Sequence, residues 1–598
     1  MKSVLKKATT LSMSALLAVS AAGLNVSAEI IKVPQEKVQK YCTFISGPYD
    51  PNLGEDATLD LSDCDLSDPD LFSYICFNDY TILPSHPSKL PADFNRDEWN
   101  KSHLYPGMGI AALHKKGIDG RGVNVAISDK DVWHMDHTEY AGKVKNIKNF
   151  VGGEAAGSLS GITGYPDNYQ HFHPSYVTSA LIGKNCGIAP EAQVLYYCGN
   201  VADSAYETSR IASLRWVIEE NKRLPEGEKV KVFSMSYGIA NPDLRAEWES
   251  LVAEAESDGI MVIDSRFGAG MGNAVIPGLL DVNDPDDLSK CQLYNTNKDE
   301  SNPMAPGSVM TQEELQEAIE KHGETPEMLI VPSGMHTGAF EEAPGDIDKY
   351  AYDLPAVSLS VPTLAGIAAL GFQIDPSLTP SQVKQFLLET KTENYVVDPN
   401  AFVKKVMENK LGEQIPDKVF EQIDSPIVKI LTDEATGVKV YLTEKSFAEG
   451  TSLHVEPIDK EHADFGIVSE DTDASVKSCT DGIQYYSIGL KNSKGENISL
   501  TSNIAVLIPI PDDFDKDEKD LSVFWINPET DEKFDTDNNI IEFQGQAYYM
   551  FTTNHLSRWA LVDKNNLAFI PLSIAIIALA VSAYVISKNK KKSRNNNI

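Results

Sequence analysis

The strongest constraint on the fold is an alternation of short apolar runs with amphipathic segments between about residues 100 and 410. Apolar residues spaced three and four apart mark helical faces here, and Ser204 and Glu207 have the spacing of a capping box at the start of one helix. Strands that alternate with helices form a largely parallel sheet covered on both faces. The sequence therefore predicts an α/β domain with strands at 123–127, 230–236, 260–263 and 328–331.

The region 425–564 has a different pattern. Alternating runs such as VKVYL, YYSIGL, IAVLIPI and AYYMFTT are separated by Gly, Asn and Asp turns. This pattern predicts an all-β module of sandwich type, joined to the α/β domain by a linker at 411–424. The module resembles the immunoglobulin-like modules that stand next to the membrane or wall anchor in many bacterial surface proteins, which implies a stalk or spacer role.

Both ends of the chain indicate export. Three lysines precede an apolar stretch that ends in Val26-Ser27-Ala28, which is typical of a signal peptide at 1–28; an uncleaved anchor helix is the alternative. Residues 567–586 carry no charge and are long enough to span a bilayer, and the tail 587–598 is strongly basic. We therefore expect a single-pass membrane protein of the bacterial cell surface whose catalytic domain is extracellular.

The acidic segment 29–99 lies between the signal and the α/β domain. Asp-Leu pairs recur every five residues, beginning at Asp60, Asp65 and Asp70. Three units permit either a short stack of turns or an irregular segment. No recognisable propeptide pattern is present, so processing by self-cleavage is left open.

Charge and cysteine content exclude some classes of protein. The formal charge of −35, from 87 acidic and 52 basic residues, disfavours nucleic acid as a partner. Seven cysteines are few and odd in number for an exported chain of this length, so disulfides are not the framework. Cys186 and Cys198 are close enough in sequence to pair, and two buried free thiols are the alternative.

Three residues of the α/β region have the chemistry of a nucleophilic site. Asp129 ends the first strand, and the carboxyl ends of parallel strands are where open α/β sheets place reactive groups. His173 heads a helical stretch, and Ser358 begins a helix of small residues whose N-terminal N–H groups favour a developing oxyanion. A serine hydroxyl needs a base to accept its proton, and the imidazole needs a carboxylate to orient it.

The segments around these residues resemble the subtilase family of serine peptidases. They read GIDGRGVNVAISDKDVWHMDHTEYAGKV, HPSYVTSALIGKNCGIAPEAQVLYY and AVSLSVPTLAGIAALGFQIDPSLTPSQVKQFL, in subtilase order. The resemblance covers about residues 107–410. It implies a subtilisin-like three-layer fold and a catalytic triad of Asp129, His173 and Ser358. It also implies that SMSYG, Ser234 to Gly238, lines the substrate cleft.

Each triad position has a neighbouring competitor. Asp131 lies two residues beyond the strand end, and His171 lacks the GIAPEAQ continuation that marks His173. Ser360 lies only two residues before Pro362, whereas Ser358 has the family's spacing of four. We therefore prefer Asp129, His173 and Ser358.

The chain departs from the subtilase pattern beside the triad. The asparagine that usually donates to the oxyanion is missing, because its position falls near Phe267 or Gly268; Ser265, Arg266 or Asn273 are the candidate replacements. In subtilisin itself, loss of this donor has been measured to lower turnover about a hundred- to thousandfold. The usual glycine after the histidine is Pro174, and the Gly-Thr before the nucleophile is Ala356-Val357.

The leading prediction is a serine endopeptidase that hydrolyses extracellular proteins or peptides. It requires no cofactor, and structural calcium, which is common in subtilases, is left open. A catalytically weak or inactive surface protein that binds peptides is the alternative, motivated by the missing asparagine. A zinc enzyme that uses His134, Asp136 and His137 with His171 and His173 is a third reading. Cleavage preference and oligomeric state are not predicted.

Overall fold

The computed structural model describes residues 30–32, 35, 58–73, 75–130, 136–151, 154–158, 173–199, 206–265, 275–295, 308–310, 329–341, 346–353, 357–459, 483–514, 521–526, 533–535 and 539–563. The chain divides into two compact units, residues 1–406 (unit 1) and 407–598 (unit 2). The expected leader at 1–28 and membrane span at 567–586 lie outside the described residues. Within the described part, no helix is both long enough and apolar enough to cross a membrane.

Unit 1 is built around a six-stranded sheet in the order β6-β5-β7-β4-β8-β9. Neighbouring strands are parallel except at the edge, where β6 is antiparallel to β5. The predicted parallel sheet is thus confirmed, although the run 328–331 contributes to a different sheet. The strands are β4 (Asn124–Lys130), β5 (Val144–Val151), β6 (Glu154–Ser158), β7 (Gln193–Gly199), β8 (Val230–Met235) and β9 (Met261–Asp264).

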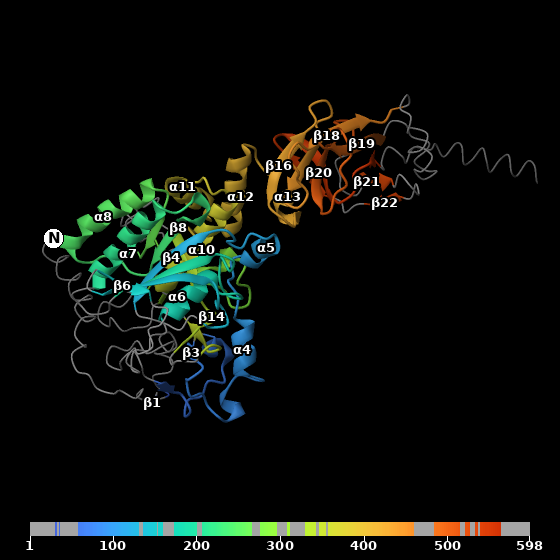
Figure 1. Cartoon of the computed structure of the whole chain (residues 1–598). Helices are drawn as coiled ribbons and strands as arrows, with labels where there is room; N and C mark the ends of the chain where they lie inside the picture. Colours follow the sequence, from blue (N-terminus) through green and yellow to red (C-terminus); the bar gives the residue numbers. More distant parts are fainter. Residues whose placement is uncertain are drawn as a thin grey trace, which may run out of the picture. The chain divides into compact units, whose positions relative to one another are not determined.

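Helices cover both faces of this sheet. They are α6 (His173–Ile182), α7 (Tyr206–Asn221), α8 (Pro242–Ser257) and α10 (Val357–Ile374). Ala126, Phe233 and Val262 of the sheet form one apolar core with α7 and α8. Successive side chains alternate between faces, so the opposite face is left for α6 and α10, which contact the same strands (Figure 1).

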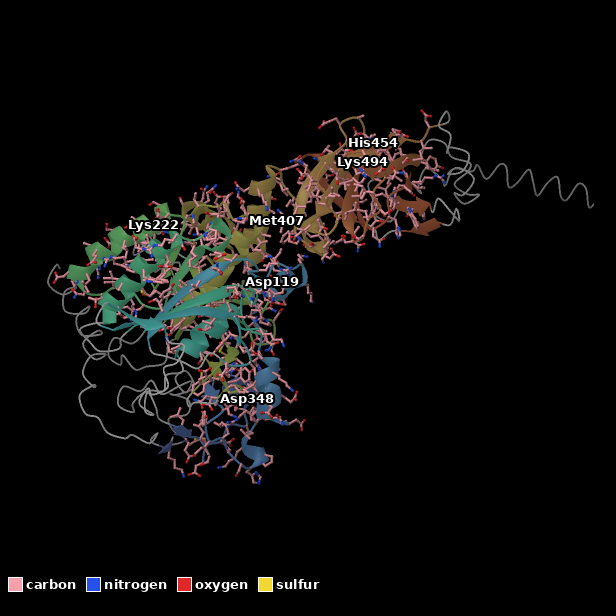
Figure 2. All side chains as sticks on the ribbon, viewed as in Figure 1. Asp119, Lys222, Asp348, Met407, His454 and Lys494 are labelled. Atoms are coloured by element: carbon pink, nitrogen blue, oxygen red, sulfur yellow. The ribbon has the colours of Figure 1, made fainter. Side chains whose placement is uncertain are left out.

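The helices α7 and α8 are also joined at their surface. Lys222, which follows α7 and is labelled in Figure 2, pairs with Glu219 at 2.9 Å and with Glu254 of α8 at 3.3 Å. These exposed pairs contribute little to stability, so the apolar core holds the helices together.

Residues 58–105 form a small core on unit 1. Leu61 and Leu66 are fully buried, and the carboxylates of Asp60 and Asp65 each accept the N–H of the serine two residues on, at 2.9 and 3.1 Å. The first two Asp-Leu units therefore share this serine contact, but a backbone turn follows only the first, at residues 62–63. The third, at Asp70, falls in the short helix α3 (Pro69–Phe72).

This segment continues into the unit through strand pairing. β3 (Phe77–Asn78) is antiparallel to β15 (Tyr350–Asp353), which also pairs with β14 (His336–Ala339). The Tyr352 ring packs against those of Phe77 and Trp99, and the Tyr352 hydroxyl donates to the carbonyl of Ser73 at 2.8 Å. The acidic segment is thus an integral part of unit 1.

The remaining elements of unit 1 are short. A four-stranded sheet in the order β12-β11-β10-β13 contains β10 (Val275–Leu279), β11 (Gln292–Asn295), β12 (Ser308–Met310) and β13 (Leu329–Gly334). β1 (Ile30–Lys32) pairs with β2 (Thr58–Asp60). The other helices are α4 (Arg96–Ser102), α5 (Ile110–Lys115), α11 (Pro380–Thr390) and α12 (Pro399–Leu411), which continues into unit 2.

Unit 2 contains two five-stranded sheets, in the orders β16-β17-β20-β24-β23 and β18-β19-β25-β21-β22. Their facing residues share one core that includes Val440, Val506, Phe551 and Trp559. This architecture agrees with the expected β-sandwich. The elements are α13 (Asp417–Gln422), within the expected linker, then β16 (Ile427–Thr432), β17 (Lys439–Thr443), β18 (Ser452–Pro457), β19 (Ile483–Lys491), β20 (Ile504–Pro509), β21 (Leu521–Ile526), β22 (Lys533–Asp535), β23 (Asn539–Phe543), β24 (Gln546–Thr553) and β25 (Arg558–Asp563).

Candidate active site

The strand that carries Asp129 is anchored where it begins. Gly120 has a φ of +86°, and a Cβ there would lie 2.7 Å from the Cβ of Ala189, so the turn requires glycine. The side chain of Gln373 in α10 accepts the N–H groups of Asp119 and Gly120 at 2.8 and 2.7 Å (Asp119 is labelled in Figure 2). The start of β4 is therefore fixed both to the GIAP turn and to the helix that carries Ser358.

Asp129 and His173 are brought together at the carboxyl end of β4. The Nδ1 of His173 lies 2.9 Å from Oδ2 of Asp129. The Asp129 side chain is 4% exposed and the His173 side chain 20% exposed, so the carboxylate is enclosed while the ring remains accessible. A carboxylate on Nδ1 fixes the tautomer in which Nε2 is the proton acceptor.

Ser358 is the second residue of α10, and its side chain is partly exposed. Helix α10 packs against α6, which begins at His173, and against β4, β8 and β9. Gly366 lets α10 approach the GIAP turn, because a Cβ there would lie 2.5 Å from Cβ of Ile188. The serine thus begins a buried helix whose neighbour begins with the histidine.

The competing serine is excluded by its surroundings. Ser360 is fully buried, and its hydroxyl contacts the carbonyl oxygen of Val331 at 2.9 Å and the hydroxyl of Ser333 at 2.8 Å. A hydroxyl with no solvent exposure cannot reach a substrate. The competitors Asp131 and His171 lie outside the described residues.

One ligand of the alternative zinc site, His137, is not available to bind a metal ion. His137 is fully buried, its Nδ1 accepts the N–H of Glu139 at 3.2 Å, and its Nε2 therefore donates to the carbonyl of Lys349 at 2.8 Å. Burial lowers the pKa of His137 because the charged ring would be desolvated. Both nitrogens are thus engaged within the protein. His134 lies outside the described residues, among which no group of three or more His, Cys, Asp or Glu could hold a metal ion.

The segment after β8 also contacts the candidate nucleophile. β8 runs parallel to β4 with Ile127 paired to Ser234, and Ser236 follows the end of β8. The Ser236 hydroxyl donates to the backbone carbonyl of Ser358 at 2.7 Å. The SMSYG motif was recognised in the sequence, but this contact was not, because nothing local in the sequence connects residues 236 and 358.

Glu207 was expected to cap its own helix with Ser204. The structure instead places its carboxylate against the segment after β8, where it accepts the N–H of Ala240 at 2.7 Å. Ser204 lies outside the described residues. The capping box thus stays a prediction, and the contact of Glu207 with the segment after β8 is a tertiary one that the sequence did not indicate.

The expected oxyanion region is only partly described. Residues 266–274, including Phe267, Gly268 and two of the three candidate replacements, lie outside the described residues. Ser265 donates its N–H to the carbonyl of Tyr237 at 3.4 Å, and the preceding Asp264 accepts from Nε1 of Trp248 at 3.0 Å. The start of the region is thus fixed next to the segment after β8.

Cys186 is a fully buried free thiol. It contacts the carbonyl of Ser179 at 3.5 Å and Oε2 of Glu139 at 3.8 Å. Burial raises the pKa of the thiol well above its ordinary value, so it is not a poised nucleophile. Of the two sequence readings, the free thiol is confirmed for Cys186 and the disulfide with Cys198 is not formed.

The arrangement of sheet, histidine helix and serine helix agrees with a match between residues 120–420 and the Subtilase family (Peptidase_S8). The chain belongs to this family, and the matched domain is that of a subtilisin-like serine endopeptidase.

One curated relative is the serine protease AprX of Bacillus subtilis (strain 168), which is 26% identical over 308 residues. The match covers 48% of this chain and 64% of AprX, so this chain spans less than two thirds of that relative. A protease structure from Pseudoalteromonas arctica PAMC 21717 aligns with 52% of this chain and 97% of its own, at 17% identity and a TM-score of 0.34. Sphericase aligns with 48% and 90%, at 18% identity and a TM-score of 0.32.

Proposed function

We propose that the chain is an active serine endopeptidase that cleaves extracellular proteins or peptides through an acyl-enzyme on Ser358. His173 accepts the proton of the Ser358 hydroxyl as the oxygen attacks the scissile carbonyl. It then gives that proton to the leaving amine, and in the second half of the reaction it activates water. Asp129 orients the imidazole and stabilises its charged form. N–H groups at the start of α10 favour the negative charge on the substrate oxygen.

The observation that carries this proposal is the hydrogen bond between Asp129 and His173. An enclosed carboxylate on one ring nitrogen, with the ring partly accessible, is the arrangement that a general base needs. Its occurrence at the end of β4, which contacts the helix that carries Ser358, favours the peptidase over the peptide-binding alternative, since binding alone requires no such pair.

Labelling by a fluorophosphonate probe tests the proposal. We expect wild-type protein to be labelled, and Ser358→Ala to lose labelling and to lower peptide turnover by a factor on the order of 10⁶. Ser360→Ala is the matched control on the same helix and should retain labelling. A folded wild-type protein that is not labelled would support the peptide-binding alternative. Activity lost on chelation, with zinc in the protein, would support the metal enzyme.

The proposed location rests on the sequence. The signal-like segment 1–28, the apolar segment 567–586 and the basic tail 587–598 together support a surface protein anchored at its carboxyl end. Protease treatment of intact cells should release the labelled domain. Labelled protein that stays protected until the cells are lysed would contradict this location.

A further inference from the structure

The segment Ser236–Asn241 begins beside the reacting groups. Ser236 follows the end of β8, the strand next to β4, and its hydroxyl donates to the carbonyl of Ser358 at 2.7 Å. The segment then runs away from the end of β8 towards α8, which begins at Pro242. The subtilase resemblance implies that its first residues line the substrate cleft, so a peptide held against Ser358 is expected to pass close to this segment.

The segment has little regular structure of its own. After Ser236, neither a helix nor a strand holds the backbone until α8 begins. Its carbonyl at Tyr237 accepts the N–H of Ser265, the last described residue before 266. The position of the segment therefore also affects the start of the region expected to hold the oxyanion donors.

The carboxylate of Glu207 accepts hydrogen bonds from several polar groups of this segment. It accepts the hydroxyl of Tyr237 at 3.2 Å and the N–H of Ala240 at 2.7 Å, and the N–H of Asn241 lies within 3.2 Å of both carboxylate oxygens. Hydrogen bonds to a charged acceptor are about twice as strong as neutral ones. One side chain of α7 thus binds the segment at three residues.

A second residue of α7 acts on the same tyrosine. Arg210 is 1% exposed, and its guanidinium carbon lies 5.5 Å from the centre of the Tyr237 ring. A cation over an aromatic face at this distance is attracted to it. Glu207 holds the hydroxyl end of Tyr237 and Arg210 the ring face, so the side chain is fixed from two directions.

We propose that Glu207 is a positioning residue for substrate binding, which fixes Ser236–Asn241 as a wall of the peptide site. This inference rests on the proposed peptidase function. Glu207 acts through the segment and has no part in bond breaking. Loss of its carboxylate should therefore weaken the binding of an extended peptide while leaving the triad intact.

The test compares a large substrate with a small probe. For Glu207→Ala we expect kcat/KM on a peptide substrate to fall roughly 10- to 100-fold, mainly through a higher KM, because small displacements of positioning groups have effects of this size. The rate of labelling by a small fluorophosphonate should stay within about twofold of wild type, because the probe lacks the extended chain that this segment would bind. Glu207→Gln keeps one acceptor oxygen and should recover most of the loss.

Two further variants control for damage to the helix. Glu219 lies on the same helix, and its side chain is 52% exposed. Glu219→Ala should leave both the labelling rate and the peptide kinetics unchanged. Tyr237→Phe removes only one donor to Glu207 and should raise KM about twofold to threefold; it replaces Glu207→Ala if that variant does not fold.

The outcomes separate this inference from the proposed function. A wild-type protein that is not labelled overturns the peptidase itself. A labelled wild type with unchanged peptide kinetics in Glu207→Ala overturns only the positioning role. Equal losses in labelling and peptide hydrolysis also overturn it, because they indicate general damage to the fold.

Discussion

The two units use β-structure in opposite ways. In unit 1, β4, β8 and β9 run parallel, so their carboxyl ends meet at one edge and bring Asp129, Ser236 and Asp264 to it. In unit 2 the paired strands are antiparallel, so neighbouring ends alternate and no edge collects one kind of end. The comparison shows how the parallel sheet of unit 1 gathers the candidate residues at one edge, whereas the stalk role of unit 2 stays a prediction from the sequence.

The most damaging changes should be core truncations, one in each unit. Phe233→Ala in unit 1 and Trp559→Ala in unit 2 each remove a buried aromatic ring and should cost about 3–5 kcal/mol of the free energy of unfolding. Calorimetry should show a different transition lowered in each variant. Only Phe233→Ala should reduce fluorophosphonate labelling at elevated temperature. Loss of labelling in Trp559→Ala, under conditions where unit 1 remains folded, would contradict the view that the active site depends on unit 1 alone.

Adding a single methyl group sharpens the contrast at a smaller scale. Gly366→Ala places a Cβ 2.5 Å from Cβ of Ile188 and should cost roughly 1–3 kcal/mol, together with some activity, because α10 carries Ser358. Gly489 in β19 of unit 2 has no atom within 4 Å of an added Cβ, so Gly489→Ala should be close to neutral. Thermal unfolding and labelling rates of both variants check this. Similar losses of stability at the two positions would contradict the close packing of α10 at Gly366.

The smallest expected effect is a pH dependence of unit 1. Burial lowers the pKa values of His137 and His336 below the ordinary value of 6.5. As pH falls below about 6.5, the unfolded chain takes up protons that the folded unit does not, so folding weakens. The stability is present above that pH and is lost as pH falls towards the lowered pKa values. The unit 1 transition should drop by several degrees between pH 7.5 and pH 5, and less in His137→Gln; an unchanged transition would contradict the burial of these rings.

The sequence predicted those parts of the site that local pattern determines. A strand followed by an acid, and a histidine that heads a helix with a GIAP continuation, are read from contiguous residues, and the structure places Asp129 and His173 together. The choice of Ser358 over Ser360 came from motif spacing, and the burial of Ser360 gives it a physical reason. The role of Glu207 was missed because helix capping is local, whereas its observed partners follow a different strand.

Long-range pairing set the other limit on prediction. The 29–99 segment was interpreted only as a turn stack or an irregular stretch, because no local pattern indicates that Phe77 pairs with Tyr352. The all-β texture of unit 2 was enough to predict two sheets but not their strand order, since antiparallel strands of similar composition can pair in many ways. The replacement for the oxyanion asparagine stays a prediction from the sequence, with Ser265, Arg266 and Asn273 as its candidates.

The pairing of β3 with β15 has a consequence for the order in which the protein is made. Phe77 leaves the ribosome early, but its partner Tyr352 is added only a few residues before Ser358. Closing so distant a contact is intrinsically slow, and it cannot begin until the later strand exists. The last strand needed by the amino-terminal core and the serine helix are thus synthesised together, so the amino-terminal core should be completed only when the candidate nucleophile is added.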